Sequence, residues 1–203
     1  MESLIALRSA RPEDIGTLLD FMMISSWGGI REAWERVRSP SETWRDRGLA
    51  ELADPGCEIG YSRFVVAELN GRMAGMVLLN FIGDTAPLDP GREPPEQAGA
   101  VALIKLSDHS VFVREIAVDG WARGRGIART LLALAERLAV SHRLGRVTLI
   151  VNDTNAPAHK LYLDEGFNAV ASQPSVGHPV FGDGSMLVLM QKLVPLSDQS
   201  MLS

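Results

Sequence analysis

The stretch that decides the fold is EIAVDGWARGRGIARTLL, Glu115–Leu132. It begins in an apolar run, passes through a polar turn that contains Gly124 and Gly126, and ends with helical periodicity. The first N–H groups of a helix have no acceptor within it, the helix N-terminus has about half a positive charge, and glycines let a ligand approach the backbone. The stretch therefore predicts an anion-binding loop or, without a ligand, a plain strand-to-helix turn.

The segments on either side of this turn alternate between strand-like and helix-like patterns. Residues 83–99 are rich in proline and predict a loop, alone or leading into a short helix. Asn70-Gly71 is typical of a hairpin turn. Helices are predicted from Pro12, around Trp34 and over 126–145, where Gly145 would end the helix. Strands are predicted at 4–10, 65–69, 73–82, 110–118, 146–151, 168–176 and 184–193.

Composition indicates a globular protein. The 203 residues, 46% of them hydrophobic, predict a single domain over 1–195 and a loose C-terminal tail at 196–203. The net charge of −5 argues against non-specific binding to nucleic acid. No apolar run approaches the roughly 18 residues of a membrane-spanning helix, so we expect no membrane partner. A single cysteine and an N-terminus without a signal-peptide core predict a cytoplasmic protein.

Two known phosphate-binding motifs fit the turn poorly. A P-loop requires a lysine where Ile127 stands. A dinucleotide fingerprint accepts Gly124 and Gly126, but Arg129 replaces its third glycine and residues 144–146 hold no acid for the ribose. A nicotinamide-dependent enzyme is therefore a disfavoured alternative.

A third motif fits better. The run Arg123-Gly124-Arg125-Gly126-Ile127-Ala128 resembles the Arg/Gln-x-x-Gly-x-Gly/Ala signature of the GNAT superfamily of N-acetyltransferases. Downstream, NDTNAPAHKLYLDEGF (152–167) is similar to the family's Asn-x-x-Ala-x-x-x-Tyr-x-x-x-Gly-Phe segment. The two motifs occur in the family's order, with a helix and a strand between them. The resemblance implies an α/β fold of the acyl-CoA N-acyltransferase type, with a central mixed, mostly antiparallel sheet of about six to seven strands flanked by helices.

The resemblance also implies a site for acetyl-CoA as cosubstrate. In the family this turn binds the pyrophosphate of acetyl-CoA. The resemblance implies that the pyrophosphate-binding residues here are Arg123, Gly124, Arg125, Gly126, Ile127 and Ala128. The backbone of the preceding strand would bind the pantetheine arm and the thioester through Ile116, Ala117 and Val118. Asn155 would contact the CoA arm, although asparagine is equally favoured as a helix N-cap at this place.

Two residues are candidates for the acid and the base of the reaction. Tyr162 could protonate the leaving thiolate, because a phenol of pKa about 10 can donate to a thiolate whose thiol has a pKa of about 8.5. Alternatively, its ring only packs on the sheet. Glu115, in an otherwise apolar strand, could deprotonate the amine directly or through a water. The alternatives are that Glu115 only pairs with Arg114 or Arg63 at the surface, and that the base is Glu68 or Glu58.

The function that the resemblance implies is transfer of acetyl from acetyl-CoA to a primary amine by direct attack in a ternary complex. The acceptor is a small-molecule amine or a peptide amine, and a homodimer is a possible state. The alternative is an acyl-CoA-binding sensor without turnover. We expect no metal, because the four histidines and Cys57 lack metal-ligand spacing, and no covalent route through Cys57, which has no activating histidine nearby. The tryptophans at 27, 34 and 44 could line an acceptor pocket, but core packing is the favoured interpretation.

Overall fold

The computed structural model describes residues 4–177 and 184–195. The described helices are α1 (Ile15–Ser25), α2 (Gly29–Val37), α3 (Trp44–Ala53), α4 (Pro95–Ile104), α5 (Ile127–Ser141) and α6 (Ala156–Asp164). Short 3-10 turns occur at Pro12–Asp14, Tyr61–Arg63, Pro90–Arg92 and Gly120–Ala122. The described strands are β1 (Ile5–Ser9), β2 (Phe64–Leu69), β3 (Arg72–Ile82), β4 (Ser110–Val118), β5 (Arg146–Asn152), β6 (Asn168–Pro174) and β7 (Met186–Leu193).

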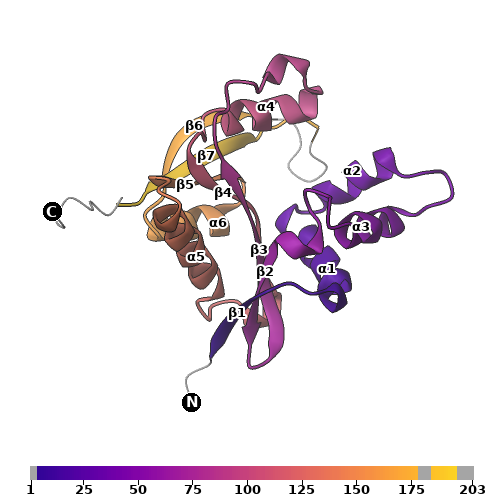
Figure 1. The fold of residues 1–203 in the computed structure, drawn as a ribbon. Coiled ribbons are helices and arrows are strands. Elements are labelled where there is room, and N and C mark those ends of the chain that lie inside the picture. Colours follow the sequence, from indigo (N-terminus) through magenta and orange to yellow (C-terminus); the bar gives the residue numbers. More distant parts are fainter. Residues whose placement is uncertain (1–3, 178–183, 196–203) are drawn as a thin grey trace. The chain divides into compact units, whose positions relative to one another are not determined.

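The strands form one seven-stranded sheet in the order β1-β2-β3-β4-β5-β7-β6 (Figure 1). The pairs β1–β2, β2–β3, β5–β7 and β6–β7 are antiparallel, and β4–β5 is parallel. This mixed, mostly antiparallel sheet with its helices confirms the predicted fold class. The chain forms two compact units, Met1–Leu79 with Arg114–Leu131 and Asn80–Val113 with Leu132–Ser203. The single domain over 1–195 stays a prediction, and the tail at 196–203 lies outside the described residues.

The first unit contains the predicted hairpin. β2 and β3 pair antiparallel from Phe64↔Leu78 to Leu69↔Arg72, with a bulge between Ala67 and Glu68. Asn70 and Gly71 both lie in the left-handed region, with φ of 52° and 77°. Left-handed backbone at both central residues of a two-residue turn matches the twist of the flanking strands, which is why Asn-Gly is favoured there.

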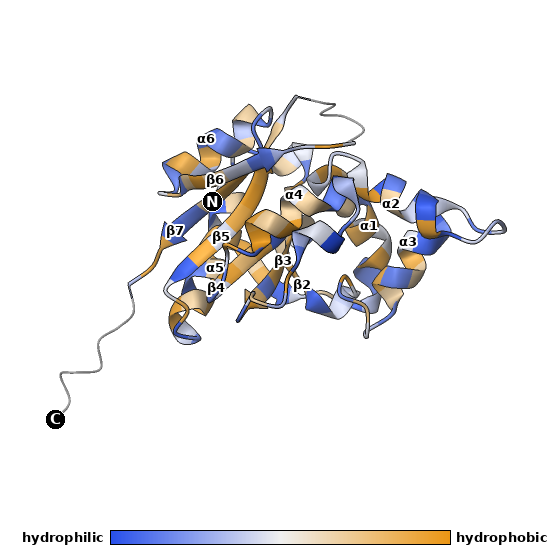
Figure 2. Ribbon diagram, turned by 90° about the horizontal axis from the view of Figure 1, so that it is seen from above, coloured by the Kyte–Doolittle hydropathy of each residue, from blue (hydrophilic) through white to orange (hydrophobic). Residues whose placement is uncertain are grey.

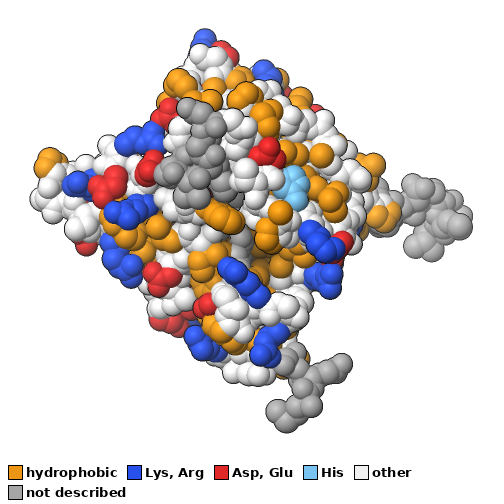
Figure 3. Space-filling view, turned by 180° about the vertical axis from the view of Figure 1, so that it is seen from behind, with side chains coloured by type: hydrophobic (Ala, Val, Ile, Leu, Met, Phe, Trp, Pro, Cys, Tyr) orange, Lys and Arg blue, Asp and Glu red, His pale blue; other side chains and the backbone are white. Residues whose placement is uncertain are grey.

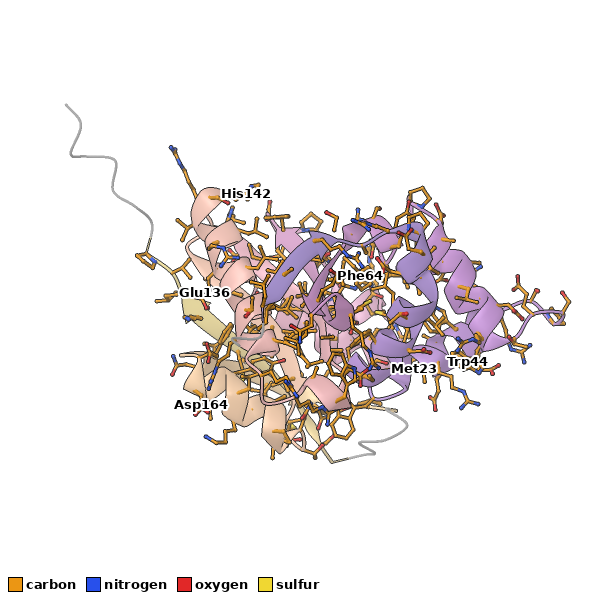
Figure 4. The ribbon with its side chains drawn as sticks, turned by 90° about the horizontal axis from the view of Figure 1, so that it is seen from below. Met23, Trp44, Phe64, Glu136, His142 and Asp164 are labelled. Carbon is orange, nitrogen blue, oxygen red and sulfur yellow. The ribbon has the colours of Figure 1, made fainter. Side chains whose placement is uncertain are left out.

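The core of the first unit lies between the hairpin and the helices α1, α2 and α3. Trp34 is 1% exposed and its ring stacks on that of Trp44, with 6.3 Å between the centroids. Gly48 on α3 allows the helices to approach, because a Cβ there would lie 2.7 Å from a methyl group of Leu19 and 2.9 Å from the Trp34 ring. These two tryptophans are therefore core residues. Met23, Trp44 and Phe64, labelled in Figure 4, belong to the elements α1, α3 and β2 around this core.

The second unit is built on the pairing of β5 with β7 and of β7 with β6. β5 pairs with β7 from Arg146↔Leu193 to Asn152↔Leu187, and its residues are mostly buried, which agrees with its hydrophobic colour in Figure 2. α4 packs on β6 and β7 (Figure 1). A Cβ on Gly99 of α4 would lie 3.0 Å from the Pro174 carbonyl oxygen, so this helix packs close to β6. The proline-rich loop therefore leads into a helix, the second of the two structures allowed by the sequence.

The predicted end of the longest helix is wrong. α5 ends at Ser141 and not at Gly145. Arg143 adopts φ of 57°, and the Leu144 N–H donates to the Ala139 carbonyl at 2.8 Å. Many helices end in this way, with a left-handed residue after the last turn and a hydrogen bond from the next N–H back to a carbonyl of the helix. Here the left-handed residue is an arginine, whereas glycine is the usual one.

The described surface is mixed in charge. On the face drawn in Figure 3, lysine and arginine side chains are interspersed with aspartate and glutamate. Within residues 4–177 and 184–195, no helix has both the length and the apolar character needed to cross a membrane.

Candidate functional site

The chain between β4 and α5 forms a tight turn that is anchored at both ends. The Asp119 N–H donates to the Ala74 carbonyl of β3 at 2.9 Å, and the Ala122 N–H donates to the Asp119 carbonyl at 3.0 Å. Ala122 and Ile127 are buried, at 0% and 1% exposure, whereas residues 123–126 are all exposed. The backbone between the two anchors therefore faces solvent.

The two glycines give this turn its shape. Gly124 and Gly126 have φ of 73° and 81°, and an added Cβ at either would meet no atom within 4 Å. Glycine is therefore needed for the left-handed backbone and not for space. The first helical hydrogen bond joins the Thr130 N–H to the Gly126 carbonyl at 3.0 Å. The N–H groups of Ile127 and Ala128 precede that bond and have no acceptor within the helix, so they are suited to bind an anion.

Arginines add positive charge at this turn. Arg123 and Arg125 are both exposed within it. The guanidinium of Arg72, at the start of β3, lies 4.3 Å from the centroid of the Trp121 ring just before the turn. Exposed helix amides beside arginines can bind a phosphate or a pyrophosphate.

The end of β4 passes close to a glycine of β3. A Cβ on Gly75 would lie 2.9 Å from the Ala117 carbonyl oxygen and 2.9 Å from a methyl group of Ile127. Ala117 is 5% exposed, and Ile116 and Val118 on either side are partly buried. Sequence reasoning missed Gly75, although an isolated glycine within a strand pattern indicates such a close approach of backbone.

Glu115 makes a contact that the sequence did not predict. The hydroxyl of Ser25, the last residue of α1, donates to Glu115 Oε2 at 2.5 Å. Burial raises the pKa of the Glu115 carboxyl, while the Ser25 hydrogen bond and the charge of Arg114 partly oppose that rise. A carboxyl whose pKa is raised towards neutrality has the property that a general base requires.

The other acids considered as bases form ion pairs. Glu58 accepts from Arg114 at 2.9 Å and is 78% exposed at its side chain, so Arg114 is paired with Glu58 and not with Glu115. Glu68 accepts from Arg8 Nε at 2.6 Å. Both carboxylates therefore lie beside an arginine and are held in an ion pair with it.

In the second unit, α6 presents Asn155 and Tyr162. Asn155 is the N-cap, and its side chain accepts from the Ala158 N–H at 3.3 Å. Tyr162 is 6% exposed, and its ring lies 5.9 Å from that of Phe167 at an angle of 57°. Helix capping by Asn155 and ring packing by Tyr162 are therefore both observed, and the cap uses the side-chain oxygen of Asn155 and not its amide nitrogen.

Two further polar atoms of this unit were missed from the sequence. Among the described residues, Asn80 Oδ1 and His159 Nε2 are buried side-chain atoms without a hydrogen-bond partner. His159 lies four residues after Asn155 and three before Tyr162, so the three share one side of α6. The spacing of Asn155, His159 and Tyr162 in the sequence could have indicated that they share one side of a helix. The sequence does not show which polar atoms remain without a hydrogen-bond partner.

The remaining candidates have structural surroundings. Cys57 is partly buried and packs against the core of the first unit. In the proline-rich loop, Asp84 accepts from the Ala86 N–H at 2.9 Å and Asp89 from the Gly91 N–H at 3.1 Å, so these acids stabilise turns. In the described part of the chain, no three histidine, cysteine or acidic side chains are grouped as a metal site would require.

The structure thus divides the predicted site residues between its two units. Glu115, Ile116, Ala117, Val118 and the turn at 123–128 lie together in the first unit. Asn155 and Tyr162 lie together on α6 in the second unit.

The chain matches one protein family over more than half of its length. The family described as "Acetyltransferase (GNAT) family" matches residues 30–167, which include β2, β3, β4, the turn and α6. No curated protein sequence matches the chain.

Many solved structures share the fold. One described as an acetyltransferase has a TM-score of 0.62 and 23% identity, covering 94% of this chain and 100% of that one. An N-acetyltransferase from Staphylococcus aureus Mu50 has a TM-score of 0.60 and 20% identity, covering 92% and 100%. The ribosomal-protein-S18-alanine N-acetyltransferase from Escherichia coli has a TM-score of 0.58 and 16% identity, covering 98% and 100%. At these identities the likeness is one of fold.

Proposed function

The chain belongs to the GNAT family of acetyltransferases, and from that premise we propose that it transfers the acetyl group of acetyl-CoA to a primary amine. The observation that supports this most strongly is the turn at 123–128. Its left-handed glycines, its helix N–H groups without an acceptor in the helix, and its exposed arginines suit a pyrophosphate, and they lie within the residues that match the family. The space around Gly124 and Gly126 leaves room for phosphate oxygens to reach the backbone.

The residues of β4 before the turn would bind the rest of the cosubstrate. The parallel pairing of β4 with β5 covers Val111, Phe112 and Val113, and Ile116, Ala117 and Val118 follow further along the strand. Backbone groups of these three residues would bind the pantetheine arm and hold the thioester carbonyl. On α6, the amide nitrogen of Asn155 would donate to the same arm while its oxygen caps the helix.

Proton transfer is assigned to two side chains. The neutral amine nitrogen attacks the thioester carbon, and Glu115 takes the proton that this nitrogen loses as the amide bond forms. The carbon–sulfur bond breaks, and the Tyr162 phenol gives its proton to the sulfur. Both substrates are bound together, so the acetyl group passes directly between them. The raised pKa of Glu115 supports its role, because a base of raised pKa accepts a proton more readily.

The acceptor is proposed only as a class. One structural neighbour is named as an N-acetyltransferase for the alanine of a ribosomal protein, which supports a peptide amine. Acidic side chains before and at the start of α4 would equally suit a small cationic amine; they are Asp84, Asp89, Glu93 and Glu96. A homodimer and a cytoplasmic location stay predictions.

The test is an acceptor panel with acetyl-CoA. Release of free CoA thiol is measured with small primary amines, with peptides that have a free N-terminus and with peptides that have a lysine, and the product is checked by mass. Matched amines that are already acetylated serve as controls. We expect thiol release only with free amines. Binding of acetyl-CoA without turnover on any of them would instead support the alternative of an acyl-CoA sensor.

A further inference from the structure

The hydroxyl of Ser25 lies between two acceptors. Ser25 Oγ is 2.5 Å from Glu115 Oε2 and 3.2 Å from the Met22 carbonyl oxygen. A serine hydroxyl has a single hydrogen and two lone pairs, so it donates to one of these atoms at a time and can accept from the other side.

This arrangement can satisfy Glu115 in both of its protonation states. When Glu115 is a carboxylate, the Ser25 hydroxyl donates to it. The Met22 carbonyl then still receives the Ser26 N–H at 3.1 Å and the Ser26 hydroxyl at 2.7 Å. When Glu115 is protonated, its carboxyl donates to Ser25 Oγ, and the Ser25 hydrogen turns to the Met22 carbonyl. Neither state leaves Ser25 Oγ, Glu115 Oε2 or the Met22 carbonyl without a partner.

We propose that Ser25 is a positioning residue for acetyl transfer, whose hydroxyl holds Glu115 before and after the carboxylate takes the proton of the amine. The inference rests on the proposed function, in which Glu115 is the base. The proton that leaves the amine stays on Glu115 until solvent removes it. Ser25 gains and loses no proton, because its hydroxyl only rotates.

The neighbouring charge of Arg114 does not hold the Glu115 carboxyl as the Ser25 hydroxyl does. Arg114 is its neighbour on β4, and the guanidinium of Arg114 is paired with Glu58 at 2.9 Å. Ser25 comes from α1, ninety residues away in the sequence. The Ser25 hydrogen bond lowers the pKa of Glu115 against the larger effect of burial, so its removal should raise that pKa further.

The first experiment measures the titration of Glu115 itself. Protein labelled with ¹³C at the glutamate carboxyl carbons is titrated by NMR, and the Glu115 signal is assigned with Glu115→Gln. We expect Ser25→Ala to move the titration to higher pH and Ser25→Thr, which keeps a hydroxyl, to restore it. Ser26→Ala is the matched control, because Ser26 bonds the same Met22 carbonyl and the Ile30 N–H. An unchanged Glu115 titration in Ser25→Ala would overturn the proposal.

The second experiment measures the pH dependence of kcat/KM with an acceptor from the panel. In Ser25→Ala the acidic limb should move to higher pH, with a tenfold loss below the limb for each pH unit moved and recovery above it. A purely structural role would lower kcat/KM equally at every pH and would contradict the proposal. A wild-type protein without acetyl transfer would overturn the proposed function, and the NMR titration would then still decide whether Ser25 controls the Glu115 carboxyl.

Discussion

Replacing Gly126 with alanine should destabilise the protein by the cost of left-handed backbone alone. Gly126 has φ of 81°, and an added Cβ would meet no atom within 4 Å, so no clash adds to that cost. An L-residue in the left-handed conformation costs about 1–2 kcal/mol. We therefore expect the free energy of unfolding to fall by about that amount, and acetyl-CoA to bind more weakly because the strained turn relaxes.

Gly16 provides the matched control. It lies in α1, and an added Cβ there also meets no atom within 4 Å. Gly16→Ala should therefore stabilise the protein by roughly 0.5–1 kcal/mol, and the two variants should differ by roughly 1.5–3 kcal/mol. Urea unfolding followed by circular dichroism measures both. Equal stability of the two variants would refute the left-handed turn, and with it the argument for an anion site.

Three further predictions concern single side chains. Tyr162→Phe should lower kcat by roughly 10²–10⁴-fold with unchanged acetyl-CoA affinity, because the ring packing remains, and an unaffected kcat would remove Tyr162 as the acid. The hydrogen bond from Arg8 lowers the pKa of Asp14 below its unfolded value, so the stability it contributes is present above about pH 4 and is lost as pH falls. Asp14→Asn should lack this acid-dependent loss in urea titrations from pH 6 down to about pH 2, and an unchanged pH dependence would contradict it. Burial raises the pKa of Glu115 in the folded protein above its value in the unfolded chain. The contribution of protonated Glu115 to the free energy of unfolding is therefore present at low pH and is lost as the pH rises through its pKa in the folded protein. Glu115→Gln should therefore be more stable than wild type at neutral pH and equal to it in acid, and a less stable variant at neutral pH would show that the carboxylate is not desolvated.

Features set by neighbouring residues were predictable from the sequence. The strand at 110–118, the Asn70-Gly71 hairpin and a helix that begins at about Gly126 were all expected, and the observed helix begins at Ile127. Each depends on hydrophobic periodicity or on turn chemistry within a few residues, which a single sequence displays directly. The resemblance to the family motifs then predicted how these local elements combine into a fold.

Features that depend on distant contacts were not predictable. The bond between Ser25 and Glu115 joins residues ninety positions apart, and no pattern near either one indicates it. α5 ends four residues before Gly145 because Arg143 adopts the left-handed backbone that the sequence would assign to glycine. Whether His159 Nε2 has a hydrogen-bond partner likewise depends on the residues packed around α6, which the sequence does not show.

The most direct test of the central claim is thermal unfolding with acetyl-CoA, CoA, NAD and NADP, each in large excess. A ligand at 100 times its Kd adds about 2.7 kcal/mol to the free energy of unfolding. For a chain of 203 residues this should raise Tm by roughly 5–10 °C. We expect that rise with both CoA ligands and none with the nicotinamide nucleotides. No rise with either CoA ligand would mean that the turn at 123–128 only joins a strand to a helix, and would contradict the proposed function.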